Sequence, residues 1–466
     1  EVLPGGGRKP NIVMIMTDDQ PYDGLGIMGR YPFLKTPNMD RLAHEGAHLE
    51  NAFVTTSLCA PSRATILTGC YSHIHGQTGN QKQDLTREIP HYGGLLQKAG
   101  YETAFIGKVH FGTSMDPIPG FDYWFGHRGQ GAYYDPYFSE NGKEFHVKGY
   151  YTDIVTDYAV NWMKRPRRKP FCLTLWHKAI HSPCTPPERH ETLYDGEPVP
   201  QPPEWEDTLE DKPKWVRARA KYGHGHWRKH MNDDDIPESF PAGGWNPLGK
   251  PAVYLQRRLK PLQAVDESLG RIMHTLEAMG ELDNTLILFT SDNGMAQYSH
   301  HKSFYSKMLM WEGPLRVPLL VRYPKLIKPG TKIKGMALNM DFAPTFLELA
   351  GASIPASMQG QSLVPLFKGK AGWRDSFMYE YGHFQGAGTG KRPQTIGVRT
   401  DRYKYITYPY LDDIDELYDL ETDPHEMNNV VSNPAYAQVL AELKTELRKL
   451  ARENGFADYA KLPEPL

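Results

Sequence analysis

A cysteine and an arginine four positions apart, Cys59 and Arg63, lie at a predicted helix start, with Cys59 just before the first helical residue. Pro61 suits the first turn of such a helix, where a missing N–H costs nothing, and Gly69 suits its end. Backbone N–H groups at a helix N-terminus favour an anion and lower the pKa of a thiol, so Cys59 is a candidate nucleophile. A buried cysteine beside an ordinary amphipathic helix is the alternative.

Apolar runs predict two buried strands of a parallel sheet, Asn11–Met16 and Leu286–Thr290. Each run is followed by side chains with hard oxygen ligands, which are Asp18, Asp19, Asp292 and Asn293. Open α/β sheets bind ligands at the carboxyl ends of their strands, and adjacent carboxylates repel one another unless a cation accompanies them. The pattern therefore predicts a divalent cation site, although each segment alone is also typical of a turn.

A third predicted strand, Thr103–Gly107, leads into Lys108 and His110. Side chains two apart on a strand point the same way, so the lysine can bind an oxyanion while the histidine moves a proton. A solvated strand end is the plainer interpretation.

Two irregular segments carry cations and aromatic rings. The first, Gly126–Tyr137, is rich in glycine and tyrosine and offers His127 and Arg128 as candidate contacts to an anionic sugar, although a plain surface loop fits equally well. The second, residues 186–250, contains a histidine cluster at 224–230 whose spacing lacks the paired ligands of a structural zinc site. We expect a binding or packing role for the second segment.

These segments, taken in order, resemble the conserved blocks of the type I sulfatases. Residues 59–63 read Cys-Ala-Pro-Ser-Arg and are followed by Leu-Thr-Gly, as in the family signature. Lys108 and His110 lie in a Gly-Lys-x-His block, and His181 lies in a segment similar to the Ala-Pro-His-x-Pro block, with Ile180 where proline is commoner. Lys307 opens a segment similar to Lys-x-x-x-Tyr-Glu-Gly-x-x-Arg-x-Pro, with Trp311 in place of tyrosine.

The resemblance implies two cofactors. In the family, the cysteine of the signature is oxidised to formylglycine by a formylglycine-generating enzyme, and the hydrated aldehyde attacks sulfur in line. The resemblance also implies one Ca²⁺, whose ligands would be residue 59 with the two pairs that follow the strands, Asp18, Asp19, Asp292 and Asn293.

The resemblance further implies catalytic roles for five residues. The residues that would hold the sulfate oxygens are Arg63, Lys108 and Lys307. His181 would protonate the leaving sugar oxygen, and His110 would take a proton from the remaining hydroxyl so that sulfate leaves.

The whole chain of 466 residues has the composition of an ordinary globular protein, with 39% hydrophobic and 23% charged residues. We expect an α/β fold with a large, mostly parallel sheet flanked by helices over residues 1–367. A smaller C-terminal subdomain, 368–466, should hold a short antiparallel sheet and a final helix, 434–454. The resemblance places this fold in the alkaline-phosphatase-like superfamily.

The predicted function is hydrolysis of sulfate esters on a sulfated polysaccharide or its oligosaccharides. A phosphodiesterase or phosphonate monoester hydrolase of the same superfamily, and a non-catalytic binder of sulfated glycan, are the alternatives. The net charge of −2 argues against a nucleic-acid partner, and no apolar run is long enough to span a bilayer. We expect a periplasmic or extracellular protein in which Cys172 and Cys184 either pair or remain free thiols.

Overall fold

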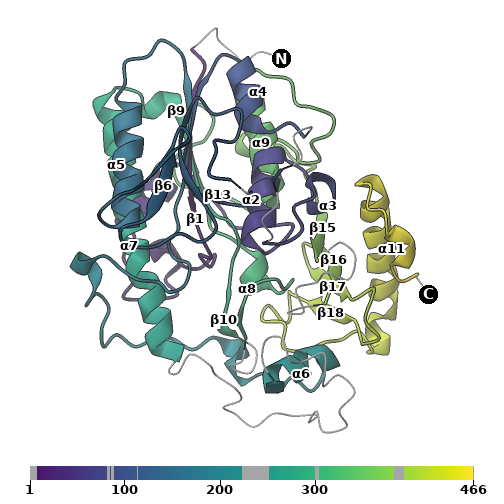
Figure 1. Cartoon of the computed structure of the whole chain (residues 1–466). Helices are drawn as coiled ribbons and strands as arrows, with labels where there is room; N and C mark the ends of the chain where they lie inside the picture. Colours follow the sequence, from purple (N-terminus) through teal and green to yellow (C-terminus); the bar gives the residue numbers. More distant parts are fainter. Residues whose placement is uncertain are drawn as a thin grey trace.

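The structure, a computed structural model, describes residues 8–80, 84–85, 89–112, 114–222, 251–299, 304–382 and 393–464. Its largest element is a ten-stranded sheet with the strand order β13-β2-β12-β9-β1-β8-β4-β5-β6-β7. β1 (Asn11–Thr17) lies near the middle and pairs in parallel with β9 (Thr285–Ser291) and β8 (Phe171–Trp176). Figure 1 shows β1 and β9 in the centre of the molecule, between two layers of helices. β4 (Glu102–His110) continues the parallel arrangement beyond β8. The predicted fold class is confirmed.

The remaining strands of the large sheet are β2 (Ala47–Leu49), β5 (Tyr123–Arg128), β6 (Tyr137–Glu140), β7 (Lys143–His146), β12 (Leu319–Arg322) and β13 (Thr331–Ile333). β12 runs antiparallel to both β9 and β2, so β2 and its parallel neighbour β13 run in the same direction as β1. Small separate pairs are formed by β3 (Ala52–Phe53) with β14 (Ala337–Leu338) and by β10 (Ala296–Ser299) with β11 (Phe304–Ser306).

Both faces of the large sheet are covered by helices because its central strand is apolar on both sides. Ile12, Met14 and Met16 pack on the face covered by α2, α4 and α9, whereas Val13 and Ile15 face α5 and α7. Burying a side chain of this size stabilises the fold by about 1.5–3 kcal/mol. The covering helices are α2 (Cys59–Thr68), α4 (Tyr92–Lys98), α5 (Tyr151–Met163), α7 (Pro251–Ala278) and α9 (Phe342–Leu349).

The other described α-helices are α1 (Pro37–Glu45), α3 (Ser72–His75), α6 (Lys214–Tyr222), α8 (Glu312–Leu315) and α10 (Val364–Phe367). Among the described helices, none combines the length and apolar character needed to cross a membrane. All four cysteines are free and buried, so the pairing considered for Cys172 and Cys184 is not formed.

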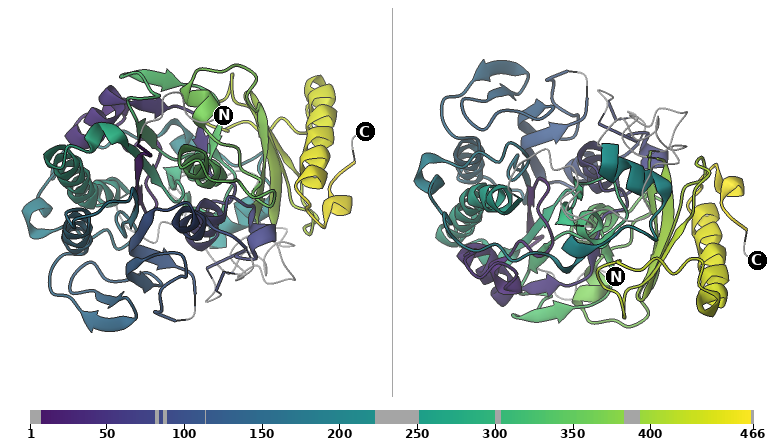
Figure 2. Two further views of the ribbon diagram at one scale, coloured as in Figure 1. Left: turned by 90° about the horizontal axis from the view of Figure 1, so that it is seen from above. Right: turned by 90° about the horizontal axis from the view of Figure 1, so that it is seen from below.

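A separate four-stranded antiparallel sheet lies in the C-terminal part of the chain. Its strands are β15 (Ser376–Tyr381), β16 (Thr395–Thr400), β17 (Tyr403–Thr407) and β18 (Glu416–Asp419). The amphipathic helix α11 (Ala437–Glu453) packs on its outer side, away from the large sheet, as both views in Figure 2 show. The predicted antiparallel sheet and final helix are therefore present.

Helix α2 carries the predicted nucleophile. Cys59 is its first residue rather than the residue before it, and Pro61 lies in the first turn as predicted. The helix ends at Gly69, whose φ of 67° is left-handed and whose N–H donates to the carbonyl of Thr65. All ten residues of α2 are buried, so the helix is held from every side.

Candidate active site

Backbone hydrogen bonds continue beyond the strand ends and bring the predicted acidic residues together. The N–H of Asp18 donates to Ala179 O (2.8 Å), and the N–H of Asp292 donates to Thr17 O (3.1 Å). The N–H of Asp19 in turn donates to Asp292 Oδ1 at 3.1 Å. Three separate segments of sequence are thereby fixed at one point of the sheet's carboxyl edge.

Four buried groups converge at this point, and we call them the acidic cluster: Asp18, Asp19, Asp292 and Cys59. Each contributes one atom, and these atoms all lie within 4.8 Å of one another. Beside them, Asn293 donates from Nδ2 to Asp19 Oδ1 (2.8 Å), whereas its buried Oδ1 has no hydrogen-bond partner among the described residues. An unsatisfied buried acceptor costs about 1–3 kcal/mol, and a hard cation would satisfy it. The donor set therefore fits an oxygen-liganded divalent cation.

Three cationic side chains balance the three carboxylates. Arg63 is fully buried and donates to Asp292 Oδ2 (2.9 Å) and Asp18 Oδ2 (3.2 Å). Lys108 donates to Asp18, and Lys307 donates to Asp19 Oδ1 at 2.6 Å. The structure thus brings together every residue that the sequence assigned to the cation and to the sulfate oxygens.

The carboxylates of the cluster differ in proton affinity. Burial alone would raise the pKa of Asp18, but Lys108, His181 and Arg63 hold it well below its usual value. Burial likewise opposes Lys307 and His181 at Asp19, whose pKa is also lowered. Burial and the neighbouring Asp18 raise the pKa of Asp292 to about 6. Asp18 and Asp19 are therefore permanent anions at neutral pH, and a bound cation would hold Asp292 in the same state.

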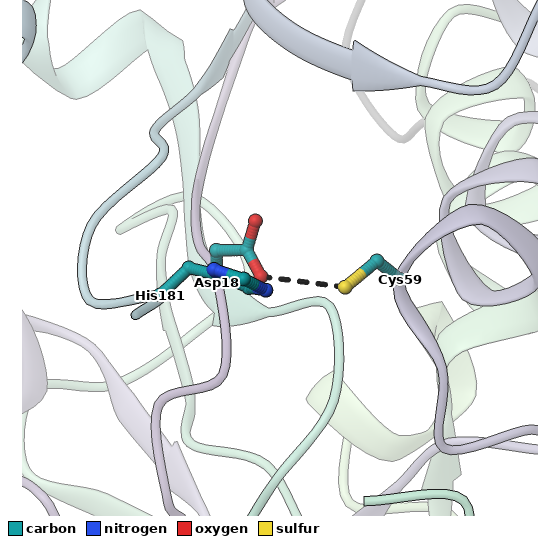
Figure 3. A group of neighbouring side chains, drawn as sticks. All are labelled: Asp18, Cys59 and His181. Carbon is teal, nitrogen blue, oxygen red and sulfur yellow. Dashed lines mark hydrogen bonds between the residues drawn. The ribbon is translucent and has the colours of Figure 1, made fainter. Parts of the chain in front are cut away.

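The thiol of Cys59 lies beside both a carboxylate and an ammonium group. Its Sγ lies 3.5 Å from Asp18 Oδ1, drawn as a dashed line in Figure 3, and 2.6 Å from Lys307 Nζ. Burial raises the pKa of this thiol well above its ordinary value, and Asp18 adds to the effect. The expectation of a thiol activated by the helix N-terminus is therefore wrong, because desolvation outweighs the helix dipole at a fully buried sulfur.

His181 reaches the cluster from the loop after β8. Its Nε2 lies 3.7 Å from Asp19 Oδ2, and its side chain is 17% exposed. Figure 3 shows it beside Asp18, with Cys59 arriving from α2. Burial lowers the pKa of His181 to about 4 against the opposing influence of Asp18, so the imidazole is neutral near pH 7. The His181 ring therefore contacts the acidic cluster and is also partly exposed, so it can contact a ligand that enters from solvent.

Lys108 and His110 occupy a distorted end of β4. The pairing register shifts between them and His110 has a φ of 77°, so the regular alternation assumed from the sequence does not hold at this point. Both residues nevertheless meet the same side chain. Gln130 accepts from Lys108 Nζ at its Oε1 (2.6 Å), and its Nε2 lies 3.5 Å from His110 Nε2. Burial, with a smaller contribution from Lys108, depresses the pKa of His110 far below its ordinary value and leaves the ring neutral.

Gln130 and Lys178 are residues of the site that the sequence analysis missed. Lys178 is buried, donates from Nζ to the backbone oxygen of Gln130 (3.0 Å) and lies 4.8 Å from the ring centroid of Tyr133. Burial lowers the pKa of this lysine to about 8, with Lys108 adding to the effect. Neither residue belongs to a periodic pattern, so the sequence held no signal for the contact between them.

Arg258 was also missed, although a signal was present. It donates to the backbone oxygen of Asp19 at 2.5 Å and is fully buried. Its position falls between Leu255 and Leu259 on the apolar face of α7. A charged residue at a core position of a helical pattern requires a buried partner, which here is the backbone of the acidic cluster.

The structure does not bring the two weak substrate candidates to the cluster. His127 is buried, and its Nε2 pairs with the hydroxyl of Tyr151 at 2.9 Å. Arg128 donates to the backbone oxygens of Ser114 (2.5 Å) and Asp116 (2.8 Å). Both residues lie at the end of β5, and His127 is the residue paired with Lys108 across the sheet. Contact of either side chain with a substrate stays a prediction. The histidine cluster at 224–230 lies outside the described residues.

Comparison with known families gives a match over most of the chain. The family described as Sulfatase matches residues 10–352, and the family described as N-sulphoglucosamine sulphohydrolase, C-terminal, matches residues 300–453. The chain therefore belongs to the sulfatase family of sulfuric ester hydrolases, within the alkaline-phosphatase-like superfamily.

Individual relatives support this placement along the whole chain. An N-acetylglucosamine-6-O-sulfatase of Bacteroides thetaiotaomicron is 35% identical, over 96% of this chain and 87% of its own length. The human N-acetylglucosamine-6-sulfatase is 30% identical, over 81% of this chain and 68% of its own. A solved structure described as a complex with its substrate D-glucosamine-2-N,6-O-disulfate superposes with a TM-score of 0.83 at 33% identity, covering 97% of this chain and 99% of the other.

Proposed function

We propose that this sulfatase removes the 6-O-sulfate of glucosamine residues in glycosaminoglycan-type glycans. The observation that carries the chemistry is the position of Cys59, which lies between Lys307 and Asp18 in a cluster balanced by Arg63 and Lys108. The substrate class is supported by the relatives named for N-acetylglucosamine 6-sulfate and by the related structure that holds a 6-O-sulfated glucosamine.

The proposal includes conversion of Cys59 to formylglycine. The buried thiol has a raised pKa, so the residue as encoded is a poor nucleophile. When present, the hydrated aldehyde supplies the oxygen nucleophile at this position. The same proposal assigns Ca²⁺ to the acidic cluster with Asn293, whose unpaired Oδ1 would complete the oxygen ligands, and the ion would supply positive charge at the sulfate.

The cationic side chains would bind and neutralise the sulfate group. Arg63, Lys108 and Lys307 already converge on the cluster from α2, β4 and the segment before α8. Donors fixed in a water-poor site stabilise charge that develops in a transition state, and loss of one donor typically costs about 10²–10³ in rate. All three side chains are at least nine-tenths buried as residues, so their orientation requires no rearrangement in water.

The two histidines would transfer protons in two successive steps, departure of the sugar and release of sulfate. His181 is the partly exposed ring and would protonate the leaving sugar oxygen at Nε2. An anionic ester beside it would raise its pKa from about 4 and so favour the protonated ring. His110, which is held neutral by burial, would accept a proton from a hydroxyl at residue 59 when sulfate is released.

A substrate panel tests the proposal. Sulfate release would be measured on D-glucosamine-2-N,6-O-disulfate and on the N-sulfated sugar lacking the 6-O-sulfate, and hydrolysis of a phosphodiester would be measured alongside, with wild-type protein and Cys59→Ala. We expect release of the 6-O-sulfate alone, abolished in the variant. Turnover of the phosphodiester without sulfate release would favour the related phosphonate monoester hydrolases. Binding of the disulfate by wild-type protein without turnover of any of the three compounds would favour a non-catalytic glycan binder.

Three further properties belong to the same proposal. A formylglycine-generating enzyme would act on residues 59–63 during maturation, since this segment carries the signature.

A periplasmic or extracellular location is supported by a Drosophila relative named as an extracellular sulfatase, which is 29% identical over 80% of this chain. A division into a catalytic domain, 1–367, and a C-terminal subdomain, 368–466, is supported by the separate sheet that begins at β15.

A further inference from the structure

A groove outside the acidic cluster has more cationic than anionic side chains in its lining. Its volume is about 720 Å³, and it lies over the ends of β2 and β13 and the segment before β12. This volume falls within the range of about 300–1,000 Å³ that is usual for ligand sites. The cationic side chains that line it are Arg316, Lys332 and Lys334. His44 and His48 also line it, and burial lowers the pKa of His48. The acidic side chain among the lining residues is Glu50, whose Oε1 lies 3.5 Å from Lys332 Nζ, so the three cations of the lining face one carboxylate.

Arg316 is held in a geometry suited to an anion. Its guanidinium lies 4.0 Å from the ring centroid of Tyr22, and one terminal nitrogen donates to the backbone oxygen of Glu50 at 2.7 Å. Its Nε is buried, lies 3.8 Å from Glu312 Oε2 and makes no hydrogen bond with a described residue. A stacked, preorientated guanidinium with donors to spare suits a sulfate or carboxylate.

One end of the groove lies at the same edge of the sheet as the acidic cluster, whereas its other end, at His44 and Gly330, lies at the amino ends of β2 and β13. β2 and β13 run parallel to β1, so Glu50 and Lys334, which follow them, lie at the carboxyl edge with Asp18. Arg316 precedes the antiparallel β12 and therefore lies at this edge too. β12 is two strands from β1 and β13 is four, which places the groove roughly 10–19 Å from the cluster at about 4.8 Å per strand.

We propose that this groove is a second glycan subsite, which binds the sulfate and carboxylate groups of sugars that neighbour the one whose ester is cut. The inference rests on the proposed function, since it takes the substrate to be an anionic chain. A single sugar in the cluster could not reach a site at that distance, whereas an oligosaccharide could. The groove would therefore favour long sulfated chains over short ones.

Charge reversal in the groove tests the subsite. Lys332→Glu with Lys334→Glu alters two exposed side chains at the groove. The matched control is Lys143→Glu with Lys148→Glu, which gives the same change of net charge at exposed positions on and after β7, the opposite edge strand of the sheet. Each variant would be assayed for kcat/KM on D-glucosamine-2-N,6-O-disulfate and on a glycosaminoglycan octasaccharide carrying 6-O-sulfated glucosamine.

We expect the ratio of octasaccharide to monosaccharide kcat/KM to fall about fivefold or more in the groove variant and to stay at the wild-type value in the control. An unchanged ratio in the groove variant would overturn the subsite. An equal fall in both variants would also overturn it, because net charge alone would then explain the effect.

A binding measurement keeps the subsite separable from the activity. Affinity of a labelled octasaccharide would be measured by fluorescence anisotropy in full-length Cys59→Ala protein, with and without the groove substitutions. A Kd weakened about fivefold by the groove substitutions supports the subsite even if no substrate is turned over, and an unchanged Kd contradicts it. Absence of sulfate release by wild-type protein from both sugars would instead contradict the proposed function.

Discussion

Asp18 is the residue on which the charges of the site converge. Its carboxylate accepts from Arg63 and Lys108 and lies within reach of the Cys59 thiol, although it is fully buried. Burying an unpaired carboxylate would cost far more than the fold could supply, so its cations are required for stability as well as for binding. The same arrangement places positive charge where an anionic ester would enter.

Substitution of Asp292 tests the cation site at the scale of one residue. Asp292→Asn removes one of the three carboxylates while keeping the size of the side chain. Ca²⁺ should raise the Tm of the wild-type protein, because a ligand at about 100 times its Kd stabilises by about 2.7 kcal/mol, and should raise that of the variant much less. The measurement is Tm against Ca²⁺ concentration after treatment with a chelator. Equal increases in Tm on addition of Ca²⁺ to both proteins would mean that Asp292 is not a calcium ligand.

Gln130 offers a second test at this scale, because it contacts both Lys108 and His110. Gln130→Met keeps the length of the side chain but removes the acceptor for the lysine. Hydrogen bonds to charged groups contribute about 1.5–3 kcal/mol, so we expect kcat to fall about 10- to 100-fold with a smaller change in KM. Steady-state kinetics on a 6-O-sulfated glucosamine give both constants, and a wild-type kcat would mean that Gln130 does not position Lys108.

At the scale of the element, strand β4 depends on a glycine for its place beside β8. Gly107 has a φ of 116°, and a Cβ at this position would lie 1.9 Å from the carbonyl oxygen of Trp176. The next residue is Lys108, so the close approach of the two strands also sets the position of the lysine. No side chain can be added without separating the strands or distorting the backbone.

Gly107→Ala should therefore reduce stability and activity together. We expect a loss of at least about 2 kcal/mol in unfolding free energy, since both the backbone angle and the contact with β8 oppose the methyl group. Thermal unfolding by circular dichroism measures the change, and sulfate release reports on Lys108. Gly100→Ala is the matched control, since it also has positive φ (91°) but no atom within 4 Å of the added Cβ. If both variants lost the same stability, the contact with Trp176 would be unimportant.

The elements and residues that the sequence predicted share a physical basis. β1 and β9 are continuous apolar runs, and the polar residues at their ends are positioned by the strands themselves, which is why Asp18 and Asp292 could be paired from the sequence. Gln130 lies in a loop without periodicity, so its contact depends on tertiary structure. β15 has the sequence SFMYEY, which lacks a regular alternation of apolar and polar residues, and it was missed. The expected lowering of the pKa of Cys59 was wrong because burial is not visible in a local pattern.

At the scale of the whole molecule, the C-terminal sheet is bonded to the segment that leads into Cys59. Glu380 of β15 donates its N–H to Thr55 O (3.0 Å) and accepts from the hydroxyl of Thr56 at its own carbonyl (2.8 Å). Its carboxylate accepts from Ser72 and from His73 Nδ1 (2.9 Å) on α3. The C-terminal sheet is therefore hydrogen-bonded to the segments that precede and follow α2, and it helps to fix the position of that helix.

The His73–Glu380 pair predicts how stability depends on pH. Burial opposes the charge of both, but the pairing raises the pKa of His73 and lowers that of Glu380 to about 2. The histidine's contribution is complete below its unfolded pKa of about 6.5 and is lost as pH rises through the raised folded value. The glutamate's contribution is complete above about 4.3 and is lost as pH falls towards 2. The pair therefore contributes most between about pH 4.5 and 6.5.

His73→Gln should lower Tm more at pH 5.5 than at pH 9, as measured by scanning calorimetry. Loss of one member of a buried pair costs about 3 kcal/mol where both are charged. His75→Gln is the control, because burial lowers the pKa of His75 to about 3 and the wild-type protein pays for its neutral ring at low pH. The Tm difference of that variant should grow with pH instead. A difference for His73→Gln that is constant with pH would contradict the charged pair.

The most direct test of the central claim is the mass of the peptide that carries residue 59, taken from protein made in a host with a formylglycine-generating enzyme. The proposal predicts a peptide in which the side-chain –CH₂SH of Cys59 has become an aldehyde, in a fraction that tracks the sulfatase activity between preparations. Active protein in which every copy retains the cysteine thiol would contradict the account.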